Sequence, residues 1–238
     1  MQSIILDFES KVEEIEEYFK FIETTTHLER DFDITKIVKV SETVYDVLKA
    51  NIFLLLYNLI ESSFKNALEK ICIEITNEKL TYKEVIPEIK RLWLEKNYKN
   101  FENIRIPKNI KKSEHIMKII DEITEDIIEI NFYIDEQKRK NDDISGNVDA
   151  REINRINQKY GAKLLSQPEN IDREALLTVK TQRNNLAHGD ETFRECGRDY
   201  TLEKLEDIKN ESIEYMRFIL SHIKIFIEDK QYKLVEES

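Results

Sequence analysis

Two side chains that could act on a phosphodiester stand five positions apart in the last third of the chain, Arg183 and His188, with Asn184 beside the arginine. Histidine titrates near neutral pH, so it can serve as a general base or a general acid. Arginine can grip two phosphate oxygens at once, and its hold strengthens as charge builds in a transition state. Asn184 can orient the histidine or donate to phosphate. These three residues are the first candidates for a catalytic group.

The residues around this group predict the helix that must position it. The helix is expected to begin near Asp172, where an acidic residue suits the positive end of the helix dipole. Its apolar positions form one stripe at helical spacing: Leu176, Val179 and Leu186. Arg183 falls on that stripe, where a guanidinium is costly unless it has a partner or lies in a functional cleft. Gly189 is suited to end the helix, which places His188 in its last turn.

The run from Thr178 to Asp190 resembles the RxxxxH motif of the HEPN superfamily, with Arg183, Asn184 and His188 at the matching positions. Residues 145–151 (SGNVDAR) and 192–198 (TFRECGR) look like one bacterial branch of HEPN-like nucleases. The resemblance covers about residues 40–230. It implies a HEPN-type up-and-down helical bundle with extra N-terminal and inserted helices. It also implies a metal-independent endoribonuclease that pairs as a C2 homodimer with the two motifs facing each other.

Composition independently favours an all-α chain. The 238 residues include only four Gly and three Pro, while Leu, Ile, Glu and Lys dominate. We expect a single domain over residues 1–238, with an N-terminal helix and linker in 1–40 and the helical bundle in 41–230. Helices are expected at 3–22, 41–75, 81–94, 113–130, 149–160, 172–188 and 201–227. A linker is expected at 24–26 and 31–33, a small strand at 34–40, and a loop at 190–200.

The formal net charge of −11 argues on its face against nucleic acid, but the basic residues are clustered. Residues 151–198 hold nine basic and seven acidic side chains, so the acidic excess lies elsewhere. The candidate RNA contacts are Arg151, Arg155, Lys159, Lys180, Arg194 and Arg198. The first three recur every four residues and form either a phosphate-binding ridge or a solvated face. The polar stretch 97–112 is likewise either a backbone contact or a solvated loop.

Glu61 is a fourth candidate for the catalytic group. It interrupts an expected central helix that is apolar on all sides between Ile52 and Tyr57, and it shares a face with Asn58. A buried carboxylate needs a cation, and Arg183 is the cation on an apolar stripe that still needs a partner. The two alternatives are that Glu61 pairs with Arg183 or that it simply faces solvent.

The sequence gives no pattern for a metal, a cofactor or a disulfide framework. Cys72 and Cys196 stand far apart and outside any metal-ligand spacing. The run from Ile52 to Ile60 is too short to span a bilayer, and the N-terminus lacks the features of a secretory signal. We therefore expect a cytoplasmic protein with no membrane partner.

These residues together predict cleavage of RNA through its own 2′-OH, leaving 2′,3′-cyclic phosphate and 5′-OH ends. The expected biological role is a toxin or anti-phage defence effector, with an antitoxin or defence-system protein as a further partner. A separate HEPN class carries a modified Tyr two residues after the motif His; Asp190 occupies that position here, which argues against that regulation. The alternative is a non-catalytic HEPN module that binds a nucleotide or a protein.

Overall fold

A computed structural model describes residues 1–31, 41–97, 147–163 and 173–234, together with residues 117, 123, 124, 127 and 128. These residues form seven α-helices and one short 3-10 helix, and no strand, so the described chain is all-α as predicted. The helices divide between two compact units. The first unit comprises residues 1–66, 144–153 and 167–220, and the second comprises 67–143, 154–166 and 221–238.

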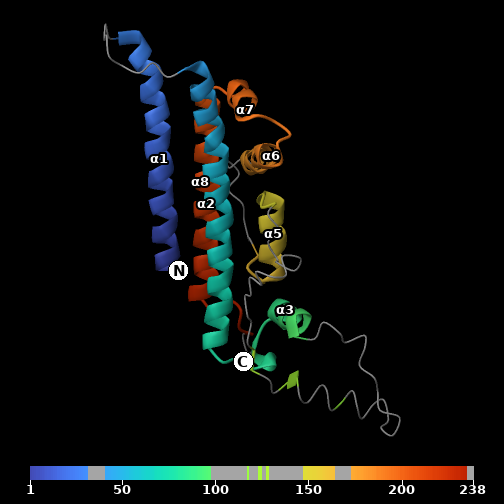
Figure 1. Cartoon of the computed structure of the whole chain (residues 1–238). Helices are drawn as coiled ribbons and strands as arrows, with labels where there is room; N and C mark the ends of the chain where they lie inside the picture. Colours follow the sequence, from blue (N-terminus) through green and yellow to red (C-terminus); the bar gives the residue numbers. More distant parts are fainter. Residues whose placement is uncertain are drawn as a thin grey trace. The chain divides into compact units, whose positions relative to one another are not determined.

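In the first unit, α1 (Gln2–Asp31) lies antiparallel to α8 (Leu202–Glu228) (Figure 1). Two ion pairs fix this order. Lys209 bonds Glu16 at 2.5 Å, and eight residues further along α8 Arg217 bonds Glu9 at 2.6 Å. Because residue numbers rise along α8 while they fall along α1, the two helices run in opposite directions.

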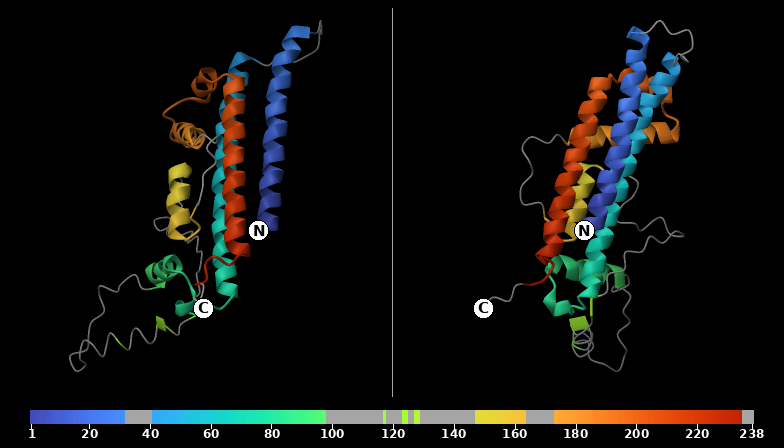
Figure 2. Two further views of the ribbon diagram at one scale, coloured as in Figure 1. Left: turned by 180° about the vertical axis from the view of Figure 1, so that it is seen from behind. Right: turned by 90° about the vertical axis from the view of Figure 1, so that its left-hand side faces the viewer.

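The same unit places α1 antiparallel to α2 (Glu42–Asn77). Lys11 donates to Ser62 at 3.2 Å, and Tyr18 donates to the Leu48 carbonyl at 2.9 Å. The first unit is thus a bundle of α1 with the parallel segments of α2 and α8 (Figure 2). The linker predicted at 24–26 is wrong, because α1 continues through Thr24 to Asp31.

The long helix α2 supplies much of the apolar core. Its fully buried residues in the first unit include Ile52, Phe53, Leu56, Tyr57, Ile60 and Phe64. By length and composition alone α2 could cross a membrane, but the core helix of a soluble bundle has the same properties. Half of the most apolar 18-residue stretch of α2 is buried inside the protein.

Two shorter helices of the first unit hold the candidate residues. Helix α6 (Glu174–His188) runs across the long helices, and α7 (Phe193–Asp199) follows it directly (Figures 1 and 2). The predicted loop at 190–200 is therefore wrong. Thr192 begins α7 through a capping box, in which its hydroxyl accepts from the Glu195 N–H while the Glu195 carboxylate accepts from Thr192. Such a box specifies a helix even when it is only seven residues long.

The second unit gathers the ends of α2 and α8 with a 3-10 helix (Tyr82–Glu84), α3 (Pro87–Asn97) and the later part of α5 (Ala150–Lys159). The expected helix at 81–94 is thus split before Pro87, which begins α3 as proline often does. The chain near residue 232 pairs with the 3-10 region: Ile86 N–H donates to the Tyr232 carbonyl at 3.0 Å. The strand expected at 34–40 and the stretch 98–112 lie outside the described residues, as does most of the helix expected at 113–130.

Candidate functional site

Helix α6 presents Arg183 and His188 in different directions. Gly189, at φ 75° in the left-handed region, ends the helix as predicted, so His188 occupies its last turn. Five residues of an α-helix correspond to a rotation of about 140° and a rise of about 7.5 Å. Arg183 accordingly faces the interior and is partly buried, whereas His188 is exposed. One copy of α6 therefore does not converge both side chains on a single point.

The aromatic ring of Tyr57 explains why an arginine can occupy the apolar stripe of α6. The Arg183 guanidinium carbon lies 4.3 Å from the centre of that ring, a cation–π contact with a fully buried residue of α2. Arg183 also donates to the Asn184 side-chain oxygen at 2.9 Å. The positive charge thus rests on an electron-rich face rather than against hydrocarbon.

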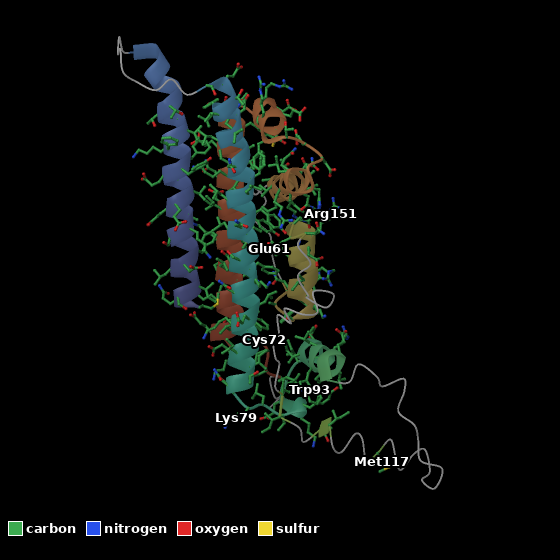
Figure 3. All side chains as sticks on the ribbon, viewed as in Figure 1. Glu61, Cys72, Lys79, Trp93, Met117 and Arg151 are labelled. Carbon is green, nitrogen blue, oxygen red and sulfur yellow. The ribbon has the colours of Figure 1, made fainter. Side chains whose placement is uncertain are left out.

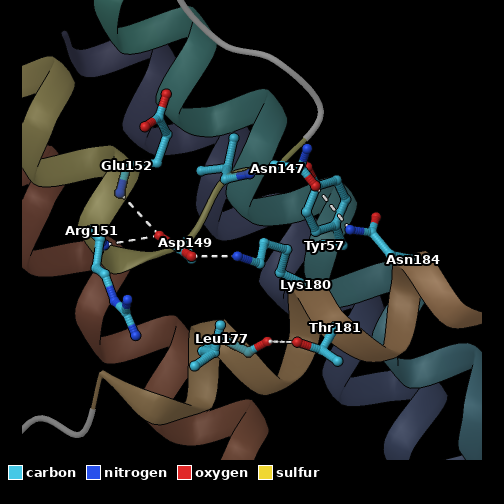
Figure 4. A network of polar contacts seen from close by, with 10 residues as sticks. Tyr57, Asn147, Asp149, Arg151, Glu152, Leu177, Lys180, Thr181 and Asn184 are labelled. Carbon is cyan, nitrogen blue, oxygen red and sulfur yellow. Dashed lines mark hydrogen bonds and ion pairs between the residues drawn. The ribbon is translucent and has the colours of Figure 1, made fainter.

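The segment that precedes α5 runs along the polar side of α6 (Figure 4). The Asn184 amide nitrogen donates to the Asn147 side-chain oxygen at 2.9 Å, and the Val148 N–H donates to the Tyr57 hydroxyl at 3.2 Å. Residues 147 and 148 are therefore bonded both to the motif helix and to the tyrosine beneath it. The segment that resembles the HEPN branch, although far from the motif in sequence, thus meets the motif helix in space.

Asp149 completes this contact and begins α5. Its Oδ1 accepts from the backbone N–H groups of Arg151 and Glu152 at 3.0 Å, so it is the N-cap of the helix expected from residue 149. Its Oδ2 lies 2.5 Å from the Lys180 ammonium. Burial alone would raise the pKa of the Asp149 carboxyl, but Lys180 and the capping N–H groups outweigh it and the pKa is lowered.

The C-terminal half of α6 is braced by residues around α7. Gln182 donates to the Tyr200 hydroxyl at 3.0 Å, and the Tyr200 ring packs edge-on against Phe53 at 4.9 Å. Lys49 donates to the Tyr200 carbonyl at 3.0 Å and pairs with Asp46 at 3.2 Å. The position of His188 is thus tied, through Gln182 on the same helix, to the core helix α2.

Cys196 is part of this brace and is not a nucleophile. It is fully buried in α7, and burial, reinforced by the carboxylates of Glu191 and Asp199, raises the pKa of its thiol to about 12. A thiol is reactive only as the thiolate, so this cysteine is inert at neutral pH. Within the part of the chain that the structure describes, no cluster of His, Cys, Asp and Glu could hold a metal ion.

Glu61 lies on α2 (Figure 3), and its expected ion pair with Arg183 stays a prediction. Among the described contacts none joins the two, although both act on Tyr57: the Glu61 charge raises its pKa and the Arg183 charge lowers it, while burial has the largest, raising effect. Glu61 lines a groove of about 550 Å³ between α1 and α2, with Lys11 and Lys65 on its walls. Four residues beyond Tyr57, it is rotated about 40° from the ring and toward that groove. Its catalytic role stays a prediction.

The predicted RNA contacts fall into three groups. Arg151 on α5 (Figure 3) and Arg194 and Arg198 on α7 are exposed in the first unit. Lys180 is bonded to Asp149 and is mostly covered. In the second unit, Arg155 is exposed and Lys159 pairs with Glu95 at 3.2 Å. The exposed arginines are the side chains of this set that a phosphate backbone can reach, whereas both lysines are partly covered by their carboxylate partners.

Comparison with the sequence models of known protein families shows which family the chain belongs to. Residues 1–232 match the sequence model of a family described as MAE_28990-like HEPN. The chain belongs to this HEPN family. No curated protein and no solved structure matches it. The resemblance noted in the motif thus extends over nearly the whole HEPN chain, N-terminal helix included, and the all-α bundle agrees with it.

The sequence did not reveal two residues of the HEPN motif's surroundings. Tyr57 was counted with the apolar core of α2, although a tyrosine among isoleucines and leucines needs a partner for its hydroxyl, which is a usable signal. Asn147 lies in the run that resembles the HEPN branch, without a pattern that indicates its partner. Only the packing of three separate segments shows that it bonds Asn184.

Proposed function

We propose that this HEPN protein is a metal-independent endoribonuclease. The observation that supports it most is the arrangement of the motif: an exposed His188 at the end of α6, and an Arg183 whose charge is held in place by Tyr57 and Asn184. HEPN domains are often ribonucleases, and this chain keeps the complete Arg–Asn–His set.

Cleavage would use the nucleophile that RNA already carries. A histidine takes the proton from the 2′-OH, whose oxygen attacks the adjacent phosphorus, and the bond to the 5′-oxygen breaks. The 5′-oxygen receives a proton from a general acid, giving a 2′,3′-cyclic phosphate and a 5′-OH. The Arg183 guanidinium neutralises the charge that builds on the phosphate oxygens. The base must start neutral and the acid must start protonated, so one histidine in one protonation state cannot perform both transfers.

A second copy of the chain would meet that need. Arg183 and His188 point about 140° apart on one helix, so two motifs facing each other across a two-fold axis would place the histidine of one beside the arginine of the other. The exposed position of His188 is compatible with such pairing. We propose a C2 homodimer with the RNA between the two motifs, its backbone contacted by exposed arginines such as Arg151, Arg194 and Arg198.

The proposed biological role is a cytoplasmic toxin or anti-phage effector held in check by a partner protein. Expression of the intact chain should arrest growth, and sequencing of RNA ends after brief induction should show new 5′-OH ends. The His188→Ala chain, expressed to the same level, should do neither. Arrest without new RNA ends, or equal arrest by the alanine variant, would contradict the proposal.

One observation favours a second candidate, a non-catalytic HEPN module. Asn184 already bonds Asn147 and Arg183 within the same chain, so the motif could serve only to hold helices together. In that case the alanine variant at His188, an exposed residue, would behave as the wild type in both measurements.

A further inference from the structure

Tyr57 touches the motif region at both ends of its side chain. Its ring lies under the Arg183 guanidinium at 4.3 Å, and its hydroxyl accepts the Val148 N–H at 3.2 Å. The residue is fully buried, and it comes from α2, the central helix of the bundle. A rigid element of the core thus supports the motif's arginine directly.

We propose that Tyr57 is a positioning residue for Arg183, and that Asn147 is a positioning residue for Asn184. The inference rests on the ribonuclease function proposed above, and it adds two residues to the machinery of the HEPN motif. Neither touches the reacting atoms in this account; each acts through the motif residue beside it.

Tyr57 can fix the orientation that the Arg183 guanidinium needs in order to bind a phosphate. Its five N–H donors lie in one plane, so a bidentate grip on two oxygens requires that plane to be held at a fixed orientation. An arginine otherwise has several flexible bonds, and ordering it costs free energy on binding. The Tyr57 ring, 4.3 Å from the guanidinium carbon, restricts the movement of the group from one side. Arg183 is therefore ordered before RNA arrives.

Asn147 orients the amide of Asn184. Asn184 presents its oxygen to Arg183 and its nitrogen to Asn147, at 2.9 Å in each case. The guanidinium can only donate, so the Asn184 oxygen faces it, and the Asn147 oxygen accepts from the Asn184 nitrogen and holds the amide in that orientation. The neighbouring Val148 and Asp149 bond Tyr57 and Lys180, which holds the whole segment 147–149 in register with α6.

Tyr57 is unsuited to a direct proton-transfer role. Burial, the largest effect, raises the pKa of its hydroxyl, and that hydroxyl accepts a backbone N–H. Its ring is the part that meets Arg183, so the test must separate ring from hydroxyl.

The decisive comparison keeps the shape of the ring and changes its charge distribution. Tyr57→Phe retains the electron-rich face, whereas pentafluorophenylalanine at position 57 has nearly the same shape with the quadrupole reversed. We expect the fluorinated protein to cleave a single-stranded RNA about 5- to 10-fold more slowly in kcat than Tyr57→Phe, as expected for loss of a cation–π contact. KM should change by less than about 3-fold, because the grip tightens mainly in the transition state.

The same pair of substitutions at Tyr18 is the matched control. Tyr18 belongs to α1 of the same unit, and its hydroxyl bonds the Leu48 carbonyl. The two Tyr18 proteins should have equal kcat. Equal kcat for the two Tyr57 proteins would overturn the role of the ring.

Asn147 is tested by changing its acceptor. Asn147→Asp keeps an oxygen for the Asn184 amide and should retain kcat within about 3-fold, while Asn147→Leu, similar in size, removes it and should lose about 10-fold, the effect of one hydrogen bond of ordinary strength. Equal rates for the two would overturn the role of Asn147.

A spectroscopic readout separates this inference from the ribonuclease proposal. In the NMR spectrum, the Arg183 Nε–H resonance is identified by its absence in Arg183→Lys. In Tyr57→Phe the ring current should shift this resonance upfield of its ordinary position for an arginine. If the shift is present but no protein of the set cleaves RNA, the ribonuclease proposal and the positioning role fall together, and only the contact stands. If the wild type cleaves RNA and the shift is absent, the positioning role alone is overturned.

Discussion

The Lys180 ammonium lies 2.5 Å from the Asp149 carboxylate, so one ion pair joins the helix that carries the motif to the residue that caps α5. Both side chains are largely covered. We expect Lys180→Met to lower the free energy of unfolding by about 1–2 kcal/mol, between the limits for exposed and buried pairs. Denaturant unfolding measures this loss. The control is Lys224→Met, at an exposed ion pair with Glu228, which should lower the free energy of unfolding by less than about 0.5 kcal/mol.

The pH dependence of stability should show the same interaction. The pKa of the Asp149 carboxyl is lowered in the folded protein from its ordinary value of 3.8. A lowered folded pKa means that the contribution is present above 3.8 and is lost as pH falls through the folded value. The stability difference between wild type and Asp149→Asn should therefore be constant from neutral pH to about pH 5 and shrink only below pH 4. A difference that grows on acidification would contradict the pairing.

Two glycines beside the motif should respond to the same substitution with different losses of stability. A Cβ on Gly197 would collide with the Asp46 carbonyl on α2, whereas Gly189 has open space but a φ of 75°. Asparagine tolerates the left-handed conformation, so Gly189→Asn should cost less than about 1 kcal/mol. Gly197→Asn should cost on the order of 3 kcal/mol, because α7 must move off α2. Thermal unfolding of the two variants checks this; equal melting temperatures would contradict the close approach of α7.

The sequence was sufficient for the helical fold because the periodic signals were strong and local. The apolar run of α2 and the helix end at Gly189 appear where the pattern placed them, and the helices expected from residues 149 and 201 begin there, capped by Asp149 and Thr201. The errors were at weak local signals. Residues 24–31 carry threonines and few apolar side chains yet extend α1, and α7 is too short to show periodicity, although its capping box was visible in Thr192 and Glu195.

The surroundings of the motif were less predictable because they depend on contacts between distant segments. The stripe on α6 correctly indicated that Arg183 needed a partner. Charge alone suggested Glu61, whereas the structure supplies the ring of Tyr57, an interaction that no spacing rule encodes. In the same way, Lys180 looked like a free cation in the sequence and is bonded to Asp149.

Glu61→Gln now separates stability from catalysis. No ion pair joins Glu61 to Arg183 among the described contacts. The free energy of unfolding of the variant should therefore lie within about 0.5 kcal/mol of the wild-type value, as for surface substitutions. If Glu61 belongs to the catalytic group, as the sequence predicts, kcat should fall at that unchanged stability. A loss near 3 kcal/mol would instead indicate a buried pair.

Arg183→Lys tests whether the geometry or only the charge of the arginine matters. A lysine supplies a point charge but cannot grip two oxygens in one plane or stack on Tyr57 as a flat group. We expect Arg183→Lys to lose cleavage nearly as completely as Arg183→Ala, while Arg194→Lys at an exposed position changes the rate by less than about 3-fold. Near-normal cleavage by Arg183→Lys would reduce its role to simple charge.

Cleavage of RNA by the purified protein in excess EDTA tests the ribonuclease proposal most directly. The substrate is a single-stranded RNA, compared with the same strand carrying 2′-O-methyl groups throughout. The account predicts that the wild-type protein cuts the first strand to 2′,3′-cyclic phosphate and 5′-OH ends and leaves the second intact. Arg183→Ala and His188→Ala, folded as judged by circular dichroism, should cut neither. Cleavage that requires Mg²⁺ or Mn²⁺, or that persists in either alanine variant, would contradict the account.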